Sequence, residues 1–160
     1  MKKLSLLAGC ALLALTLGLL PALAASPMPA ADAAALWDYI SKTSPYQKWG
    51  QYGDFKGMQA SKAVHGSNVQ VWANGPALEA KKAPLPEGSI IVKEGMGDDH
   101  KVNVVVVIYK VKGYNPQAGD WFWAKYEPSG KVGASGKVQG CISCHGGKAS
   151  NDYVLAHIYK

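Results

Sequence analysis

The stretch from Ser89 to Tyr126 constrains the fold more than any other part of this sequence. Three runs of β-branched and aromatic residues lie in it, at 89–93, 102–111 and 121–126, separated by turn-forming residues at 95–99 and 113–119. Strands joined by such short turns pair antiparallel, because a parallel pair needs a long crossover that usually contains a helix. The sequence therefore predicts an antiparallel meander at the centre of the domain.

Shorter elements are expected around this meander. Residues 30–48 have helical spacing that ends before Pro45, and residues 68–73 alternate apolar and polar side chains as a strand does. Residues 76–82 begin with a proline and fit a short helix, whereas residues 128–140 are rich in Gly, Ser and Lys and fit a loop. We see no internal repeat. The predicted fold class is α+β, a mainly antiparallel sheet with flanking helices.

Residues 1–24 have the organisation of a secretory signal peptide. Two lysines precede an apolar run from Leu4 to Leu20, and Ala22-Leu23-Ala24 is the small-residue pattern after which signal peptidase cuts. This predicts export to the periplasm and a single mature domain at 25–160. An uncleaved membrane anchor is the weaker interpretation, because the apolar run is short for a membrane span.

Charge and cysteine content limit what the mature domain can be. Loss of the two N-terminal lysines lowers the formal charge from +6 to +4, and no dense basic run remains to bind nucleic acid. The residual basic charge suits an acidic redox partner protein, or serves solubility alone. Cys10 lies in the predicted signal peptide, where a lipoprotein cleavage box is a weaker alternative. Cys141 and Cys144 remain, too close together for a disulfide to stabilise the fold much.

Cys141-Ile142-Ser143-Cys144-His145 is the attachment sequence of c-type haem. Two thiols three residues apart on one helical turn can each bond one vinyl group at the porphyrin edge, and the next residue then presents an imidazole to the iron. A redox dithiol would need a βαβ context, a zinc site would need further ligands, and a disulfide would leave His145 unexplained. The motif predicts one covalent haem c, bound by Cys141 and Cys144, with His145 as the iron ligand.

The sixth ligand of the iron is not marked by any local motif. An electron-transfer cytochrome c closes the iron with a methionine or a second histidine, for which the candidates are Met58, Met96, His65, His100 and His157. In the small helical cytochromes c the motif lies near the N-terminus, whereas here it follows a long β-rich region. A six-coordinate electron carrier therefore remains the alternative to a protein with an open iron.

The chain resembles the cytochrome P-460 and cytochrome c′-beta family. The resemblance covers nearly all of the mature chain and rests on His65-Gly66 before strand 69–74, on 85–94, on 119–123 and on 141–145. It implies an antiparallel β fold, commonly dimeric, around a five-coordinate haem that is open to small ligands. The P-460 branch oxidises hydroxylamine with a lysine cross-linked to the porphyrin, and the c′-beta branch binds nitric oxide and carbon monoxide in an apolar pocket.

The resemblance also assigns two candidate catalytic positions. Lys93 matches the cross-linking lysine, so the resemblance implies that it is either cross-linked to the haem or in close contact with it. In an ungapped alignment from Trp121, the position of the distal carboxylate in the hydroxylamine-oxidising members falls on Val105. This departure leaves open whether the protein is an enzyme, because a valine cannot accept a proton. Nearby residues that could replace the carboxylate are Glu94, Asp98, Asp99 and His100.

Overall fold

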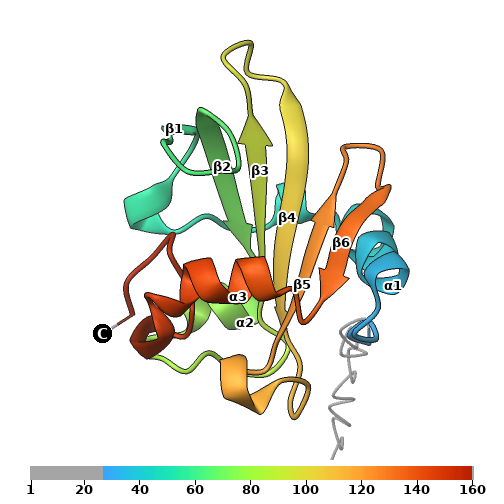
Figure 1. The fold of residues 1–160 in the computed structure, drawn as a ribbon, viewed down its shortest axis with the longest axis vertical. Coiled ribbons are helices and arrows are strands. Elements are labelled where there is room, and N and C mark those ends of the chain that lie inside the picture. The colour runs from blue at the N-terminus through green and yellow to red at the C-terminus, as the bar shows by residue number, and fades with distance from the viewer. Residues whose placement is uncertain (1–26, 160) are drawn as a thin grey trace, which may run out of the picture.

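The computed structural model describes residues 27–159, so the predicted signal peptide at 1–24 lies outside the described part (Figure 1). One antiparallel sheet contains, in this order, β1 (Gln59–Ala60), β2 (Asn68–Ala73), β3 (Ile90–Met96), β4 (Val102–Lys110), β5 (Trp121–Tyr126) and β6 (Val132–Gly136). Each strand pairs with the next one along the chain. The predicted α+β fold with an antiparallel meander is confirmed.

Three α-helices flank the sheet: α1 (Ala33–Asp38), α2 (Gly75–Glu79) and α3 (Gln139–Gly146). Asp32 caps α1 by accepting hydrogen bonds from the amides of Ala34 and Ala35, and one π-helical turn then extends the helix to Thr43, before Pro45. Short 3-10 turns occur at Tyr46–Lys48, Gly53–Phe55, Pro116–Ala118 and Ala149–Asn151. Within residues 27–159, no helix has the length and hydrophobicity needed to cross a membrane.

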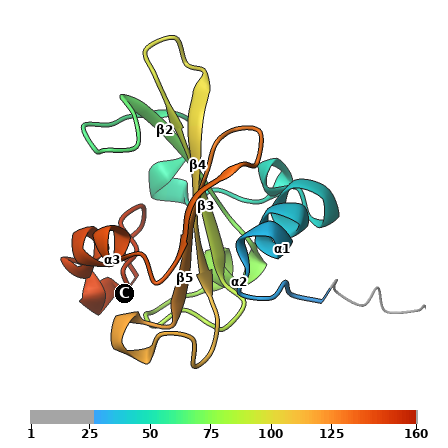
Figure 2. The ribbon, with the colours of Figure 1, turned by 45° about the vertical axis from the view of Figure 1, so that its right-hand side comes forward.

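The two faces of the sheet bury different sets of side chains, because successive residues of a strand point to opposite faces. Figure 2 shows α1 on one face and α3 on the other. On the α1 face the core includes Leu36, Ile40, Val92, Val105, Val107 and Tyr126. On the α3 face it includes Val71, Ile91, Ile108, Trp121, Trp123 and Val154. A site between the sheet and α3 therefore takes its residues from the α3 face of each strand.

Two parts of the sheet differ from the sequence prediction. Residues 128–140, predicted as a loop, contain β6, whose polar and small side chains are tolerated because it is an exposed edge strand. The turn predicted at 95–99 starts later, because β3 continues through Gly95 and Met96 with a register shift against β4. Both extensions lengthen the sheet without changing its topology.

Candidate functional site

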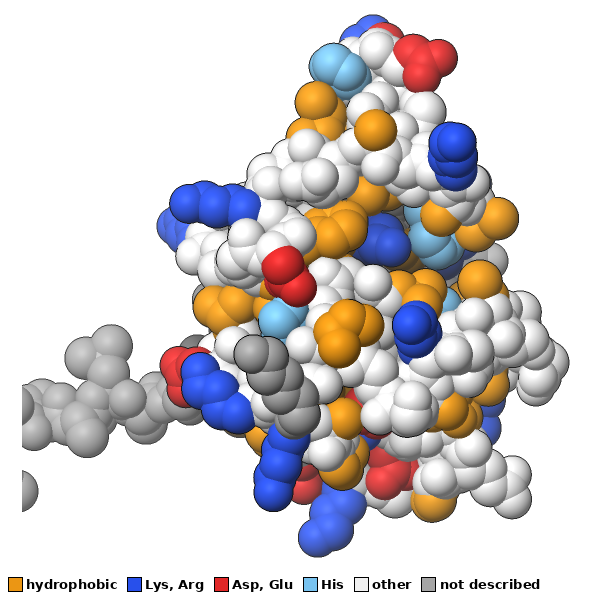
Figure 3. Space-filling model, turned by 90° about the vertical axis from the view of Figure 1, so that its left-hand side faces the viewer, with side chains coloured by type: hydrophobic (Ala, Val, Ile, Leu, Met, Phe, Trp, Pro, Cys, Tyr) orange, Lys and Arg blue, Asp and Glu red, His pale blue; other side chains and the backbone are white. Residues whose placement is uncertain are grey.

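A pocket that opens to solvent lies between α3 and the sheet. Most of its lining is apolar and comes from Val71, Ile91, Val106, Ile108, Leu155 and Ala156. Figure 3 shows a hollow on this side of the molecule, in which lysine and histidine side chains lie among hydrophobic ones. A mostly apolar cavity with a few polar groups is typical of a small-molecule or cofactor site.

The register of the sheet builds the floor of this pocket from neighbouring residues. Lys93 of β3 pairs with Val71 of β2 and with Val106 of β4, and Val106 pairs in turn with Lys125 of β5. Directly paired residues present their side chains on the same face of the sheet. These four side chains therefore form one row across the floor, and all four line the pocket.

Helix α3 carries the cysteine pair and the histidine of the attachment motif. Cys141 and Cys144 are free thiols; Cys141 is half-buried and lines the pocket, and Cys144 is exposed. Burial raises the pKa of the Cys141 thiol, which keeps it protonated at neutral pH. Neither sulfur atom is in a disulfide, and addition to a vinyl group requires such free thiols.

His145 enters the pocket from α3 in a fixed orientation. Its Nδ1 atom lies 2.8 Å from the carbonyl oxygen of Tyr153, and because a carbonyl can only accept, Nδ1 must carry the proton. The remaining nitrogen, Nε2, is then free to bind a metal. Trp123 packs its indole edge-on against the imidazole at a centroid distance of 4.8 Å. Burial lowers the pKa of His145, which favours the neutral form that ligates iron.

A buried ion pair holds the backbone that orients His145. The Lys110 ammonium lies 2.6 Å from both carboxylate oxygens of Asp152. The same carboxylate accepts hydrogen bonds from the Leu85 amide at 2.7 Å and the Trp121 indole at 3.3 Å. Since Asp152 precedes Tyr153 directly, these contacts fix the carbonyl that accepts the hydrogen bond from His145.

Residues 43–156 match the sequence model of one protein family, which is described as cytochrome P460. The chain belongs to the cytochrome P460 family. A search of curated proteins found no match. Membership confirms the resemblance that the sequence motifs indicated, and it implies a haem cofactor.

The residues of this cytochrome P460 chain fit a haem. Cys141 and His145 line one mostly apolar pocket, and Cys144 lies between them in sequence on the same helix, with its side chain exposed. Trp123 also lines the pocket, and its buried indole nitrogen has no hydrogen-bond partner among residues 27–159, as expected for a donor that faces a bound group. A zinc site, the alternative for the cysteine pair, would need more ligands. The described residues contain no cluster of three or more His, Cys, Asp or Glu side chains suited to a metal.

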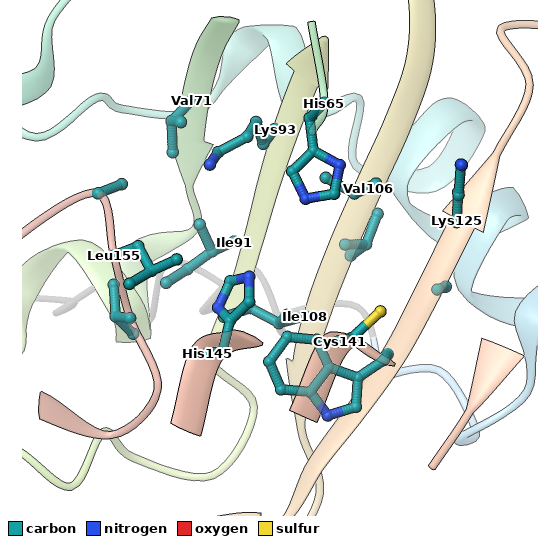
Figure 4. Close-up of a pocket in the computed structure, with 15 residues that line it drawn as sticks. His65, Val71, Ile91, Lys93, Val106, Ile108, Lys125, Cys141, His145 and Leu155 are labelled. Atoms are coloured by element: carbon teal, nitrogen blue, oxygen red, sulfur yellow. The ribbon is translucent and has the colours of Figure 1, made fainter. Parts of the chain in front are cut away.

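Lys93 and Val105, the two positions assigned by resemblance, lie on opposite faces of the sheet. Lys93 points into the pocket (Figure 4). Val105 pairs with Glu94 and Tyr126, and its side chain is buried in the core against α1, away from the pocket. Val105 therefore faces away from the pocket, whereas Val106 and Ile108 of the same strand line it.

Of the proposed sixth ligands, only His65 lines the pocket. Met58 is exposed, Met96 is buried at the end of β3, and His100 lies in the exposed turn before β4. His157 pairs with Asp54 at the surface, with Nδ1 2.7 Å from the carboxylate. The structure thus separates His65 from the other four candidates.

Sequence reasoning missed three groups of this site. Side chains alternate between the two faces along β4, so knowing that β4 pairs with β3 would have placed Val106 on the same face as Lys93. Trp123 is one of several aromatic residues in this region, and the sequence does not distinguish it from the others. No sequence signal marks the Tyr153 carbonyl, since its role depends on a left-handed backbone at Tyr153, with φ 65°.

Proposed function

We propose that this protein is an exported c-type cytochrome with one haem, which binds or oxidises small nitrogen species such as nitric oxide or hydroxylamine. Cys141 and Cys144 would hold the haem covalently and His145 would be its axial ligand, with the second axial position open. The observation that carries the proposal is the pocket lining. Besides His145 it offers valine and isoleucine side chains, with His65, Lys93 and Lys125 as polar groups, and its described lining contains no methionine.

Bound in this pocket, the haem would supply a redox-active iron with an exchangeable coordination position. The chain's own groups would then decide which ligand enters. Val71, Val106 and Ile108 form apolar walls that exclude charged molecules and accept small uncharged ones. The Tyr153 carbonyl keeps the His145 proton on Nδ1, so that Nε2 remains the ligand atom.

Hydroxylamine oxidation is the second form of this function, and Lys93 supports it. Burial lowers the pKa of Lys93, so its amine is neutral and nucleophilic at a lower pH than that of an ordinary lysine. The amine points into the pocket from β3 (Figure 4). Family resemblance assigns this position to the lysine that is cross-linked to the porphyrin in the hydroxylamine-oxidising branch.

The proposed location, oligomeric state and redox partner rest on the sequence and on the family resemblance. The signal sequence supports a periplasmic location, and the family resemblance supports a homodimer. Electrons would pass to or from a redox partner protein, and the basic mature chain favours an acidic one.

The optical spectrum of the purified ferrous protein, with and without carbon monoxide, tests the proposal. A five-coordinate haem gives a high-spin spectrum that changes on addition of the gas. A red-shifted Soret band would point to the cross-linked, hydroxylamine-oxidising form. A low-spin spectrum that carbon monoxide leaves unchanged would reject the proposal in favour of a six-coordinate electron carrier.

A further inference from the structure

His65 reaches the pocket from the opposite side to His145. It lies in the loop before β2, whereas His145 rises from α3, and Figure 4 shows both imidazoles pointing toward the same space. The side chains around it are the apolar wall residue Val106 and the amine of Lys93. His65 is therefore the side chain on this side that can both donate and accept a hydrogen bond without carrying a charge.

Two glycines hold the His65 loop against the sheet. A Cβ atom at Gly95 of β3 would overlap the carbonyl oxygen of His65, so the loop backbone can lie directly on the strand only because residue 95 is glycine. Gly66 has φ 138°, and a Cβ atom there would overlap the backbone of Met96. The close approach of the loop to β3 is thus built into the sequence at two positions.

Hydrogen bonds fix the same loop at its other end. The Ser67 hydroxyl donates to the Asp98 carboxylate at 2.6 Å, and the Asn68 side-chain amide donates to the Gly97 carbonyl at 3.1 Å. The Ser61 amide donates to the Ser67 carbonyl at 2.8 Å. These contacts anchor the loop to the β3–β4 turn, so His65 is held in place without any hydrogen bond from its own imidazole to another described residue.

The charges around His65 favour its neutral form. Burial lowers its pKa to about 4, and the positive charge of Lys93 acts in the same direction, followed by His145 and Lys125. These are the titratable groups that face the imidazole, from β3, α3 and β5 respectively. At neutral pH the ring presents one N–H donor and one unprotonated nitrogen toward the pocket.

We infer that His65 is the residue that selects ligands in this pocket, by hydrogen bonding to a small polar molecule bound opposite His145. The inference rests on the proposed function and identifies the ligand class that the pocket prefers. A ligand with its own N–H or O–H groups and lone pairs, such as hydroxylamine, gains a hydrogen bond from His65. Carbon monoxide is a weak acceptor and gains little, so His65 raises the preference for polar ligands over carbon monoxide.

The test compares His65→Leu and His65→Gln with the wild-type haem protein. Hydroxylamine affinity is measured by optical titration, and the C–O stretching frequency of the carbon monoxide complex is measured by infrared spectroscopy. We expect His65→Leu to weaken hydroxylamine binding about tenfold, the worth of one hydrogen bond, and to raise the C–O frequency. Carbon monoxide affinity should change less than twofold, and His65→Gln should restore part of both effects because glutamine keeps a donor.

His100→Asn is the matched control, because it removes an imidazole from an exposed turn and asparagine tolerates the positive φ of 60° found there. The control should leave both measurements at the wild-type values. Wild-type hydroxylamine affinity and C–O frequency in His65→Leu would overturn the inference while leaving the proposed function intact. A low-spin wild-type spectrum that becomes high-spin in His65→Leu would also overturn it, since His65 would then be the sixth iron ligand. Failure of the wild-type protein to bind carbon monoxide or hydroxylamine would instead reject the proposed function.

Discussion

The Nδ1–H group of His145 donates a hydrogen bond to the carbonyl oxygen of Tyr153 over 2.8 Å. The acceptor belongs to a segment in which both Asp152 and Tyr153 have left-handed backbones, with φ of 54° and 65°. Such conformations are unfavourable for residues other than glycine and persist only where surrounding contacts enforce them. The contacts that enforce this one are those of the Asp152 carboxylate, so the proposed haem ligand His145 and a buried ion pair are connected through two adjacent residues.

Replacement of Asp152 by asparagine should destabilise the protein strongly. It leaves the buried ammonium of Lys110 without its counter-ion, and removal of one partner of a buried pair typically costs about 3–5 kcal/mol. Urea denaturation of Asp152→Asn measures this loss. Asp99→Asn is the control, since Asp99 forms an exposed pair with Lys101 and should cost less than about 1 kcal/mol. Equal losses in the two variants would show that the buried pair does not hold the segment.

The central strands could be predicted from the sequence because they bury side chains on both faces. The run 102–111 is rich in β-branched residues, and the structure has a strand at Val102–Lys110. β6 could not be predicted, because an edge strand with exposed side chains needs no apolar pattern and takes its structure from pairing with β5. The apolar pattern of the sequence thus identified the core strands, whereas β6 depends on its pairing with β5.

Some residues of the candidate site could likewise be identified from the sequence, whereas others come together only in the folded structure. Cys141, Cys144 and His145 are adjacent in sequence, so their spacing alone identified them. Lys93 and His65 come together only through the pairing of β2 with β3 and the docking of a loop on Gly95. Val105 lies on the face opposite to Lys93, and the sequence could not show this without the strand register, because a shift of one residue moves a side chain to the opposite face of a sheet.

Gly95→Ala should destabilise the fold and displace the His65 loop. The added methyl group would overlap the His65 carbonyl and approach the side chain of Val104, both within a packed sheet. Overpacking of this kind costs about 1–3 kcal/mol. Thermal unfolding of Gly95→Ala checks the prediction, with Gly53→Ala as a control that meets no atom within 4 Å and should unfold near the wild-type temperature. An unchanged unfolding temperature for Gly95→Ala would mean that the loop does not dock on β3.

The stability of the protein should fall in acid partly because of His65. Its pKa of about 4 in the folded state lies below the ordinary value of 6.5, so the unfolded chain binds the proton more readily. Stability that is fully present above pH 6.5 is therefore lost as the pH falls toward 4. Solvent screening of the half-buried ring limits the loss to about 1 kcal/mol.

Denaturation of wild type and His65→Gln at several pH values isolates this contribution, because His145 is present in both. As the pH falls from 6.5 toward 4, the wild-type protein should lose unfolding free energy relative to His65→Gln. A difference that stays constant with pH would contradict a depressed pKa at His65.

Lys93 and Lys125 give a direct test of the cross-link, because they flank Val106 on the same face of the sheet. Lys93 is the more buried of the two, and burial lowers its pKa. Family resemblance assigns the cross-link to Lys93, so proteolysis and mass spectrometry of the haem protein should find its peptide joined through haem to the peptide of Cys141 and Cys144.

Lys93→Arg should separate these two peptides, because a guanidinium stays charged and cannot supply the amine. The same change at Lys125 keeps the size and charge of the substitution but lies at the exposed position of β5, and it should leave the joined species intact. The Soret band should shift in Lys93→Arg and not in Lys125→Arg. If the wild-type protein yields haem attached to the cysteine peptide alone, Lys93 is unbonded, and the apolar wall around Val106 then indicates a pocket for binding diatomic gases.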